Sequence, residues 1–199
     1  MIDKSHLPVT LQQGDALLVV DVQTDFLPGG ALAVPNGDAV VAVMNGYLSI
    51  FSDYGLPIFA SRDWHPTEHC SFLEQGGSWP PHCVAETSGA AFAVGLKLPE
   101  STAIISKATQ REVDAYSAFQ DTGLTQQLQE RGIRRLFVGG LATDYCVLHT
   151  VRDARKAGFE VYLLEDAIRA VEVSRGDGER AVAEMIKVGA VVIGLEQAA

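Results

Sequence analysis

Cys146 lies where a reactive thiol would be expected. It follows a short apolar run, Arg135–Val138, that ends in two glycines, which is typical of a buried strand meeting a tight turn. Thr143 or Asp144 is suited to cap a helix, and the apolar residues that follow recur at helical spacing. Cys146 would then lie in the first turn, where free backbone N–H groups and the helix dipole favour a thiolate. The sequence thus predicts a nucleophile; the alternative is a small buried hydrophobic residue.

One acidic and one basic residue at other strand ends could act on this thiol. Asp21 closes the apolar run that starts at Asp15, and Lys107 closes a second run. An aspartate could accept the thiol proton as general base, and a nearby lysine would lower the thiol pKa and fix the carboxylate. Taken singly, Asp21 could equally be an N-cap and Lys107 a solvated strand end.

One carboxylate and two imidazoles form a candidate metal site. Asp63 and His65 are followed at a distance by His82, and such a set leaves open positions on Zn, Fe or Mn. His69 and Glu74 lie in the same stretch and are candidates for a fourth ligand. Surface histidines are the alternative interpretation. Cys70 and Cys83 are interpreted as packing residues, since they form no C-x-x-C motif.

The elements that must position these groups alternate between strands and helices. Expected strands cover 15–21, 56–61, 103–107, 135–139, 159–164 and 190–193; expected helices begin at Asp38, cover 120–131, run from the Cys146 turn to Gly158, and cover 178–187. This alternation predicts an α/β fold, a doubly wound parallel sheet with helices on both faces. Ligands bind such sheets beyond the carboxyl ends of the strands, where the candidate residues lie. Residues 62–101 form a long connection whose aromatic content favours a functional role.

Composition bounds the class of protein. The chain has 199 residues, 47% of them hydrophobic, which predicts one domain over 1–199 with an N-terminal arm over 1–13. A net charge of −10 disfavours nucleic acid and anionic membranes as partners. The N-terminus lacks the pattern of a signal peptide or membrane span, and three cysteines are an odd number for a disulfide framework. We therefore expect a cytoplasmic protein.

A glycine motif near the C-terminus could suggest a nucleotide site. Residues 176–181 match G-x-G-x-x-A, the dinucleotide fingerprint. The motif lies late in the chain, its preceding strand would be short and charged, and Asp177 and Glu179 would lie in the phosphate cradle. Nucleotide binding is therefore the weakest of the alternatives.

Six motifs, taken together, resemble one family. Residues 21–32, 63–66, 79–84, Lys107, 114–119 and 140–146 resemble, in this order, the nicotinamidases (pyrazinamidases) of the isochorismatase-like, or cysteine hydrolase, family. The resemblance covers roughly residues 14 to 195 and implies a three-layer fold with a six-stranded parallel sheet. It also implies hydrolysis of nicotinamide to nicotinate and ammonia, with pyrazinamide as a further substrate, and so a role in the salvage of pyridine nucleotides for NAD.

The resemblance assigns roles to residues. Cys146 would attack the carboxamide carbon, Asp21 would carry the proton to the leaving amine, and Lys107 would orient the pair, giving a thioester that water then hydrolyses. Backbone N–H groups of Ala142 and Cys146 would form the oxyanion hole, after a cis peptide bond between Leu141 and Ala142.

The resemblance also implies the metal and the pocket. Asp63, His65 and His82 would hold one divalent ion that binds the pyridine nitrogen, with His69, Glu74 or water as fourth ligand. The expected walls of the pocket are Phe26, Leu32, Trp79 and Tyr116. The family pattern is departed from at Thr24 and Leu27, where asparagine and cysteine are common.

Other functions remain open at this point. A sibling hydrolase would act on another small amide or on an isochorismate-like substrate, but relatives without the metal lack the two histidines. A non-catalytic binding module would not need Asp21, Lys107 and Cys146 together. The sequence does not decide whether the chain forms a homo-oligomer.

Overall fold

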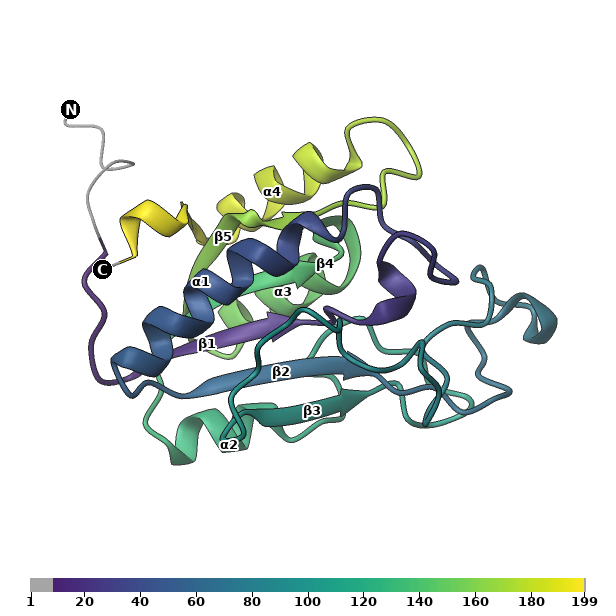
Figure 1. Cartoon of the computed structure of the whole chain (residues 1–199), viewed down its shortest axis with the longest axis horizontal. Helices are drawn as coiled ribbons and strands as arrows, with labels where there is room; N and C mark the ends of the chain where they lie inside the picture. The colour runs from purple at the N-terminus through teal and green to yellow at the C-terminus, as the bar shows by residue number, and fades with distance from the viewer. Residues whose placement is uncertain (1–8, 199) are drawn as a thin grey trace.

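A parallel six-stranded sheet forms the centre of the molecule, in the order β3-β2-β1-β4-β5-β6 (Figure 1). The computed structural model describes residues 9–198. Its strands are β1 (Asp15–Val20), β2 (Ile58–Asp63), β3 (Ala103–Lys107), β4 (Arg135–Leu141), β5 (Glu160–Arg169) and β6 (Val191–Ile193). Every pairing between neighbouring strands is parallel, so the predicted fold class is confirmed.

Helices cover both faces of the sheet, again as predicted. They are α1 (Ala39–Asp53), α2 (Leu124–Glu130), α3 (Leu148–Lys156) and α4 (Asp177–Lys187), with 3₁₀ turns at Thr24–Phe26, Leu73–Gln75 and Leu195–Gln197 and a π-helical turn at Thr143–Val147. Leu17 and Val19 of β1 pack in one apolar cluster with α1, while Ala16, Leu18 and Val20 pack in a second cluster with α2, α3 and α4. The alternation follows from the two-residue period of a strand. Because both faces are covered, β1 is fully buried.

The chain reverses its direction across the sheet at β1. It builds β1, β2 and β3 outward on one side and then returns to place β4 on the other side of β1. Such a switch point leaves a crevice at the carboxyl ends of the strands, where ligands bind in open α/β sheets. Asp21 directly follows β1, and the turn with Cys146 directly follows β4.

Several expected boundaries are wrong. The second strand begins at Ile58 and extends to Asp63, and β5 continues to Arg169, five residues beyond the expected Leu164. The expected helix over 120–131 is limited to Leu124–Glu130, because Gly123 adopts a left-handed conformation at its start (φ 70°). Neither Thr143 nor Asp144 caps the helix: both lie inside the π-helical turn, which begins after Ala142.

The long connection between β2 and β3 is ordered by pairing with itself and with the first loop. Isolated bridges join His65 to Val84 and Phe72 to Trp79, and Phe92 pairs with Gln23. The Gln23 amide also donates to the carbonyl oxygens of Asp63 and Ala90, at 2.8 and 2.9 Å. The connection therefore packs over the carboxyl ends of the strands instead of projecting away.

The two ends of the described chain lie together. Val9 bridges to Ala198, and its N–H donates to the carbonyl oxygen of Gln197. Residues 1–8 of the predicted arm lie outside the described residues. Within 9–198, no helix has both the length and the apolar character required to span a bilayer.

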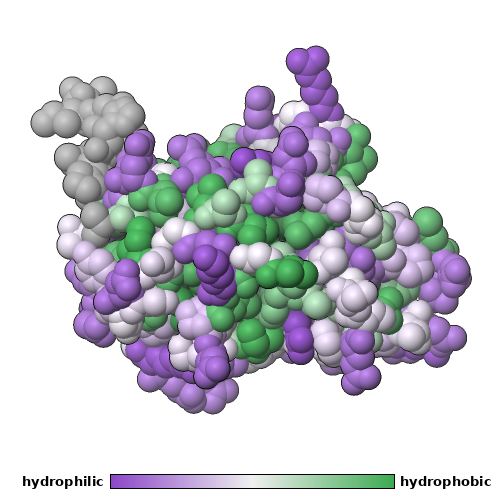
Figure 2. Space-filling model, viewed as in Figure 1, coloured by the Kyte–Doolittle hydropathy of each residue, from purple (hydrophilic) through white to green (hydrophobic). Residues whose placement is uncertain are grey.

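Hydrophilic side chains dominate the rim of the face shown in Figure 2, and apolar ones gather across its middle. Large exposed apolar side chains, such as Tyr54, Leu73 and Val94, belong to different segments. Acidic residues outnumber basic ones by 25 to 15 in the whole chain. An excess of acidic groups repels polyanions at a distance, which limits association with nucleic acid.

Replacing Gly140 with alanine should strongly destabilise the protein. Gly140 has φ 131°, and a Cβ atom there would lie 2.0 Å from the carbonyl oxygen of Val20 in the adjacent strand. We expect the Gly140→Ala variant to lose about 4 kcal/mol or more of unfolding free energy. Gly55, at φ 64° with nothing within 4 Å of its Cβ position, is the matched control and should lose only about 1 kcal/mol as Gly55→Ala. Urea unfolding followed by circular dichroism measures both; equal losses would contradict the clash.

Candidate active site

The structure brings Asp21, Lys107 and Cys146 into contact at the carboxyl ends of the strands. The Lys107 ammonium nitrogen lies 3.0 Å from Asp21 Oδ2 and 3.5 Å from Cys146 Sγ. Asp21 is fully buried, and Lys107 and Cys146 are nearly so. Since these residues follow β1, end β3 and follow β4, the parallel sheet accounts for their meeting.

Lys107 keeps its charge although it is buried. Its ammonium group also pairs with Asp63 Oδ1 and donates to the carbonyl oxygen of Ala115 at 3.0 Å. Burial alone would lower the pKa of Lys107, but the two carboxylates outweigh it and raise the pKa well above its usual value. Lys107 is therefore a fixed cation shared by Asp21 and Asp63.

The expected thiolate at Cys146 is not favoured in the resting site. Burial raises the pKa of the Cys146 thiol well above its usual value, and Asp21 and Asp63 add to this, while Lys107 only partly offsets it. Lys107 lowers this pKa, as expected, but burial and the two carboxylates outweigh it, so the expected thiolate is not the resting form. The resting nucleophile is a protonated thiol that needs a base.

Asp21 has the environment of such a base. Burial raises the pKa of Asp21 above its usual value, although Lys107 opposes this. Ser61 in β2 donates a hydrogen bond of 2.7 Å to Asp21 Oδ1, and so fixes the carboxylate. Sequence reasoning missed Ser61; its only signal was a hydroxyl near the end of an apolar strand.

Asp63, His65 and His82 form a group that fits a metal ion. One ligand atom from each lies within 4.8 Å of the others, and all three residues are buried. Among residues 9–198, neither ring nitrogen of His65 has a hydrogen-bond partner, although Nε2 lies 3.6 Å from Asp63 Oδ2. Such buried polar atoms without partners are rare unless a ligand satisfies them. The donor set of one carboxylate and two imidazoles suits a divalent transition metal.

The protonation of these groups also suits a metal. His82 Nδ1 lies 2.8 Å from the carbonyl oxygen of Pro80, to which it can donate, leaving the Nε2 lone pair for a ligand bond. Burial lowers the pKa of His82, so its imidazole is neutral at neutral pH. The pKa of Asp63 is held below its usual value, because Lys107 and His65 outweigh burial.

The two candidates for a fourth ligand lie differently. The His69 ring packs 4.2 Å from the His65 ring, but its Nδ1 bonds Ser71 Oγ at 2.8 Å and its Nε2 lies 3.1 Å from the carbonyl oxygen of Val113. Glu74 is exposed on the Leu73–Gln75 turn. Neither belongs to the group formed by Asp63, His65 and His82.

A small cavity opens onto Cys146, Asp63 and His82. It is lined by all four expected wall residues, namely Phe26, Leu32, Trp79 and Tyr116, and also by Val34, Ala142, Tyr145 and Val171. An apolar cavity with a few converging polar groups is typical of a site for a small molecule.

The walls of this cavity hold one another. The Trp79 indole N–H donates to Tyr116 Oη at 3.0 Å, and the ring of Tyr145 packs against both aromatic rings, with centroids at 5.1 and 5.6 Å. Sequence reasoning missed Tyr145, although it directly precedes Cys146. Val171 follows the unexpected extension of β5 and had no sequence signal.

The expected cis peptide bond before Cys146 is present. The peptide bond between Leu141 and Ala142 is cis. Ala142 and Cys146 both line the cavity, and the Ala142 carbonyl oxygen accepts from the N–H groups of Tyr145 and Val147 at 3.1 Å. The turn therefore directs the Ala142 carbonyl oxygen into the helical segment.

Comparisons with known proteins agree on one family. The model of the isochorismatase domain matches residues 15–197. The nicotinamidase of Escherichia coli is 40% identical over 88% of this chain and 92% of its own. The pyrazinamidase of Pyrococcus horikoshii, solved in complex with zinc, superimposes with a TM-score of 0.88 at 48% identity, covering 91% of this chain and 99% of the other. PnC1 of L. infantum, solved in complex with nicotinate, gives 0.90 at 39% identity over 97% and 99%.

Proposed function

The chain belongs to the isochorismatase family, and from that membership we propose that it is a nicotinamidase, an amidohydrolase that converts nicotinamide to nicotinate and ammonia. The observation that carries the proposal is the cavity lined by Cys146, Asp63 and His82, with Asp21 and Lys107 beside the thiol and His65 beside Asp63. A flat pyridine ring bearing a carboxamide needs both a nucleophile and a separate group that recognises the ring nitrogen.

Cys146 begins the first half of the reaction. Asp21 takes the thiol proton as sulfur attacks the carboxamide carbon, and the negative charge on the carboxamide oxygen is received by the backbone N–H groups of Ala142 and Cys146. Asp21 then gives the proton to the nitrogen, the C–N bond breaks, and ammonia leaves a thioester on Cys146. Lys107 stabilises the ionised carboxylate and holds it beside the sulfur.

Water completes the second half. Asp21 removes a proton from a water molecule as its oxygen attacks the thioester carbon, and returns that proton to the sulfur when the C–S bond breaks. Nicotinate leaves, and Cys146 is again a neutral thiol, the form that its raised pKa favours. One carboxylate thus serves both halves as base and acid.

Asp63, His65 and His82 hold one divalent metal ion in this proposal, with zinc, iron and manganese as the candidates. When bound, the ion supplies an electron-pair acceptor for the pyridine nitrogen, so its role is positioning. His69, Glu74 or water completes its ligands. The unpartnered nitrogens of His65 support this assignment. Phe26, Leu32, Trp79 and Tyr116 enclose the ring between their side chains.

Removing His82 should lower the metal content and weaken substrate binding together. We expect the His82→Ala variant to bind the metal roughly 10- to 100-fold more weakly and to show a higher KM. Metal analysis after dialysis, combined with ammonia-release kinetics, measures both. Glu74→Gln is the matched control and should keep its metal, because Glu74 is exposed and lies outside the group formed by Asp63, His65 and His82. Full activity of the protein after exhaustive chelation would remove the metal from the proposal.

Ammonia release from metal-replete protein tests the function itself. Nicotinamide should be hydrolysed, and pyrazinamide, which has the same carboxamide on a diazine ring, should be hydrolysed too. The sibling activity is the second candidate: the chain would then turn over another small amide or an isochorismate-like substrate. Turnover of such a compound without ammonia from nicotinamide would overturn the proposal.

The cellular setting follows from the chemistry. Nicotinate production places the enzyme in the salvage of pyridine nucleotides for NAD. We propose the cytoplasm as its compartment, because Cys70, Cys83 and Cys146 are all free and a reducing compartment keeps unpaired thiols from oxidation. Sedimentation of the purified chain would establish whether it forms a homo-oligomer.

A further inference from the structure

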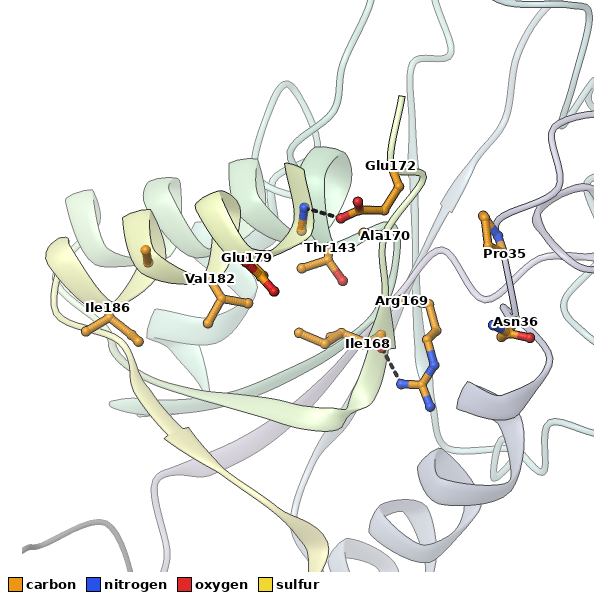
Figure 3. A pocket seen from close by; sticks show the side chains of 12 residues that line it. Pro35, Asn36, Thr143, Ile168, Arg169, Ala170, Glu172, Glu179, Val182 and Ile186 are labelled. Carbon is orange, nitrogen blue, oxygen red and sulfur yellow. Dashed lines mark hydrogen bonds between the residues drawn. The ribbon is translucent and has the colours of Figure 1, made fainter. Parts of the chain in front are cut away.

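In residues 170–176, which join β5 to α4, Val171 lines the substrate cavity, while Ala170 and Glu172 line a larger outer groove of about 660 Å³ that Figure 3 shows. The segment is thus part of the wall between the cavity and the groove. Three pairs of neighbouring residues make this wall, and in each pair the first lines the cavity and the second lines the groove: Val34 with Pro35, Ala142 with Thr143, and Val171 with Glu172. The position of the 170–176 segment therefore fixes where Val171 lies in the lining of the substrate cavity.

The carboxylate of Asp144 holds this segment from the side of the nucleophile. Oδ1 accepts the N–H of Val171 at 2.9 Å, and Oδ2 accepts the N–H of Glu172 at 3.0 Å. Both oxygens are thus used by two successive backbone donors just beyond the end of β5. Glu172 adopts φ 58°, so the chain turns sharply at this point. Hydrogen bonds to an ionised acceptor are among the stronger ones in proteins.

Glu172 holds the same segment from the side of α4. Its Oε2 and Oε1 accept the N–H groups of Gly176 and Gly178, both at 2.7 Å, and Figure 3 shows Glu172 reaching to the first turn of α4. A Cβ atom on Gly178 would lie 2.9 Å from Glu172 Oε1. The backbone N–H groups of the two glycines in the G-x-G-x-x-A motif thus donate to the carboxylate of Glu172. In a nucleotide-binding protein, a phosphate would occupy this place.

We propose that Asp144 is a positioning residue that holds Val171 as a wall of the substrate cavity and thereby sets how tightly the ring of the substrate is bound. Asp144 lies in the same π-helical turn as Cys146. One turn therefore carries both the nucleophile and the carboxylate that holds Val171, and Val171 and Cys146 line the same cavity. This inference rests on the proposed function only for the identity of the ligand. The bonds that carry it do not depend on the reaction.

A purely structural role for Asp144 makes a different prediction. An acidic residue in the first turn of a helix stabilises that helix through the dipole, and Asp144 occupies such a position. In that case the Asp144→Asn variant would lose stability or kcat, because Cys146 lies two residues away, while KM for nicotinamide would not change. Positioning of Val171 predicts the reverse, a change in KM with little change in kcat.

The test measures kcat, KM and stability for Asp144→Asn, with Asp153→Asn as the matched control that removes the same charge from α3. We expect KM for nicotinamide to rise about tenfold in Asp144→Asn with kcat within about threefold, and no change in Asp153→Asn. In a Val171→Ala background, Asp144→Asn should change KM by less than about twofold, since the wall is already removed. An unchanged KM, or an undiminished effect in that background, would overturn the proposal.

Two further measurements separate this inference from the proposed function. Hydrogen exchange of the Val171 and Glu172 amides should be faster in Asp144→Asn than in the parent protein, whatever the substrate. Equal exchange would contradict the attachment itself. The second measurement is calorimetric titration with nicotinate of two variants, Cys146→Ala and the double variant Cys146→Ala/Asp144→Asn. If neither variant binds nicotinate, the proposed function is contradicted. If both bind it equally well, only the inference about Asp144 is contradicted.

Discussion

Cys146→Ala should abolish ammonia release, with kcat lower by roughly four orders of magnitude or more, as expected when a covalent nucleophile is removed. Cys146 lines the cavity beside Asp21 and Lys107, and no second thiol is among the lining residues. The aromatic walls and the metal ligands remain, so nicotinamide should still bind. An ammonia-release assay and calorimetric titration with nicotinamide measure the two effects separately.

Cys70→Ala is the matched control for this loss. Cys70 is half-buried, and burial raises the pKa of its thiol, which makes it a poor nucleophile. Its replacement should leave kcat within about twofold. Appreciable turnover in Cys146→Ala, with the metal removed and contaminating enzyme excluded, would show that a water molecule attacks the amide directly.

Asp21→Asn should have the second largest effect, a fall in kcat of about 10²- to 10⁴-fold. The amide has almost the same shape as the carboxylate but cannot accept the thiol proton, which the raised pKa of Cys146 makes necessary. Lys107 keeps Asp63 as its partner, so the cavity should retain its charge pairing. Metal content and nicotinamide affinity should change little, so the fall in kcat would come from the chemical steps.

The exposed Asp121 provides the control for Asp21→Asn. Both residues adopt left-handed backbone conformations, φ 48° for Asp21 and φ 56° for Asp121, which asparagine tolerates well. Asp121→Asn therefore makes the same substitution in the same conformation away from the thiol, and kcat should not change. Wild-type kcat in Asp21→Asn would exclude Asp21 as the base and leave proton transfer to another group.

The sheet was predictable because its information is local. Each of the six strands is a short apolar run, and the alternation of strands with helices restricts the topology to few choices. The extension of β5 to Arg169 was not predictable, since Glu165 and Asp166 interrupt its apolar pattern and only pairing with β4 keeps the chain extended.

The site residues could be identified in the sequence from the ends of strands and from the motif resemblance. Their protonation states could not be predicted in this way. Asp21, Lys107 and Cys146 meet because parallel strands end at one edge. The raised pKa of Cys146 results from burial and from two carboxylates that are far away in the sequence, so no local pattern could reveal it. Asp144 was interpreted as a cap for the same reason: its partners, Val171 and Glu172, follow it by 27 and 28 residues.

The central position of β1 also bears on how the chain folds during synthesis. β1 pairs on one side with β2, about 40 residues later, and on the other with β4, about 120 residues later. A nascent chain that has emerged only through residue 107 can pair β1, β2 and β3 but leaves the second edge of β1 open, with Leu17, Val19 and their neighbours unsatisfied there. Open apolar strand edges attract other chains. Pairing of β4 with β1 is thus the event that covers this edge of β1, and it places the following turn, with Cys146, beside Asp21.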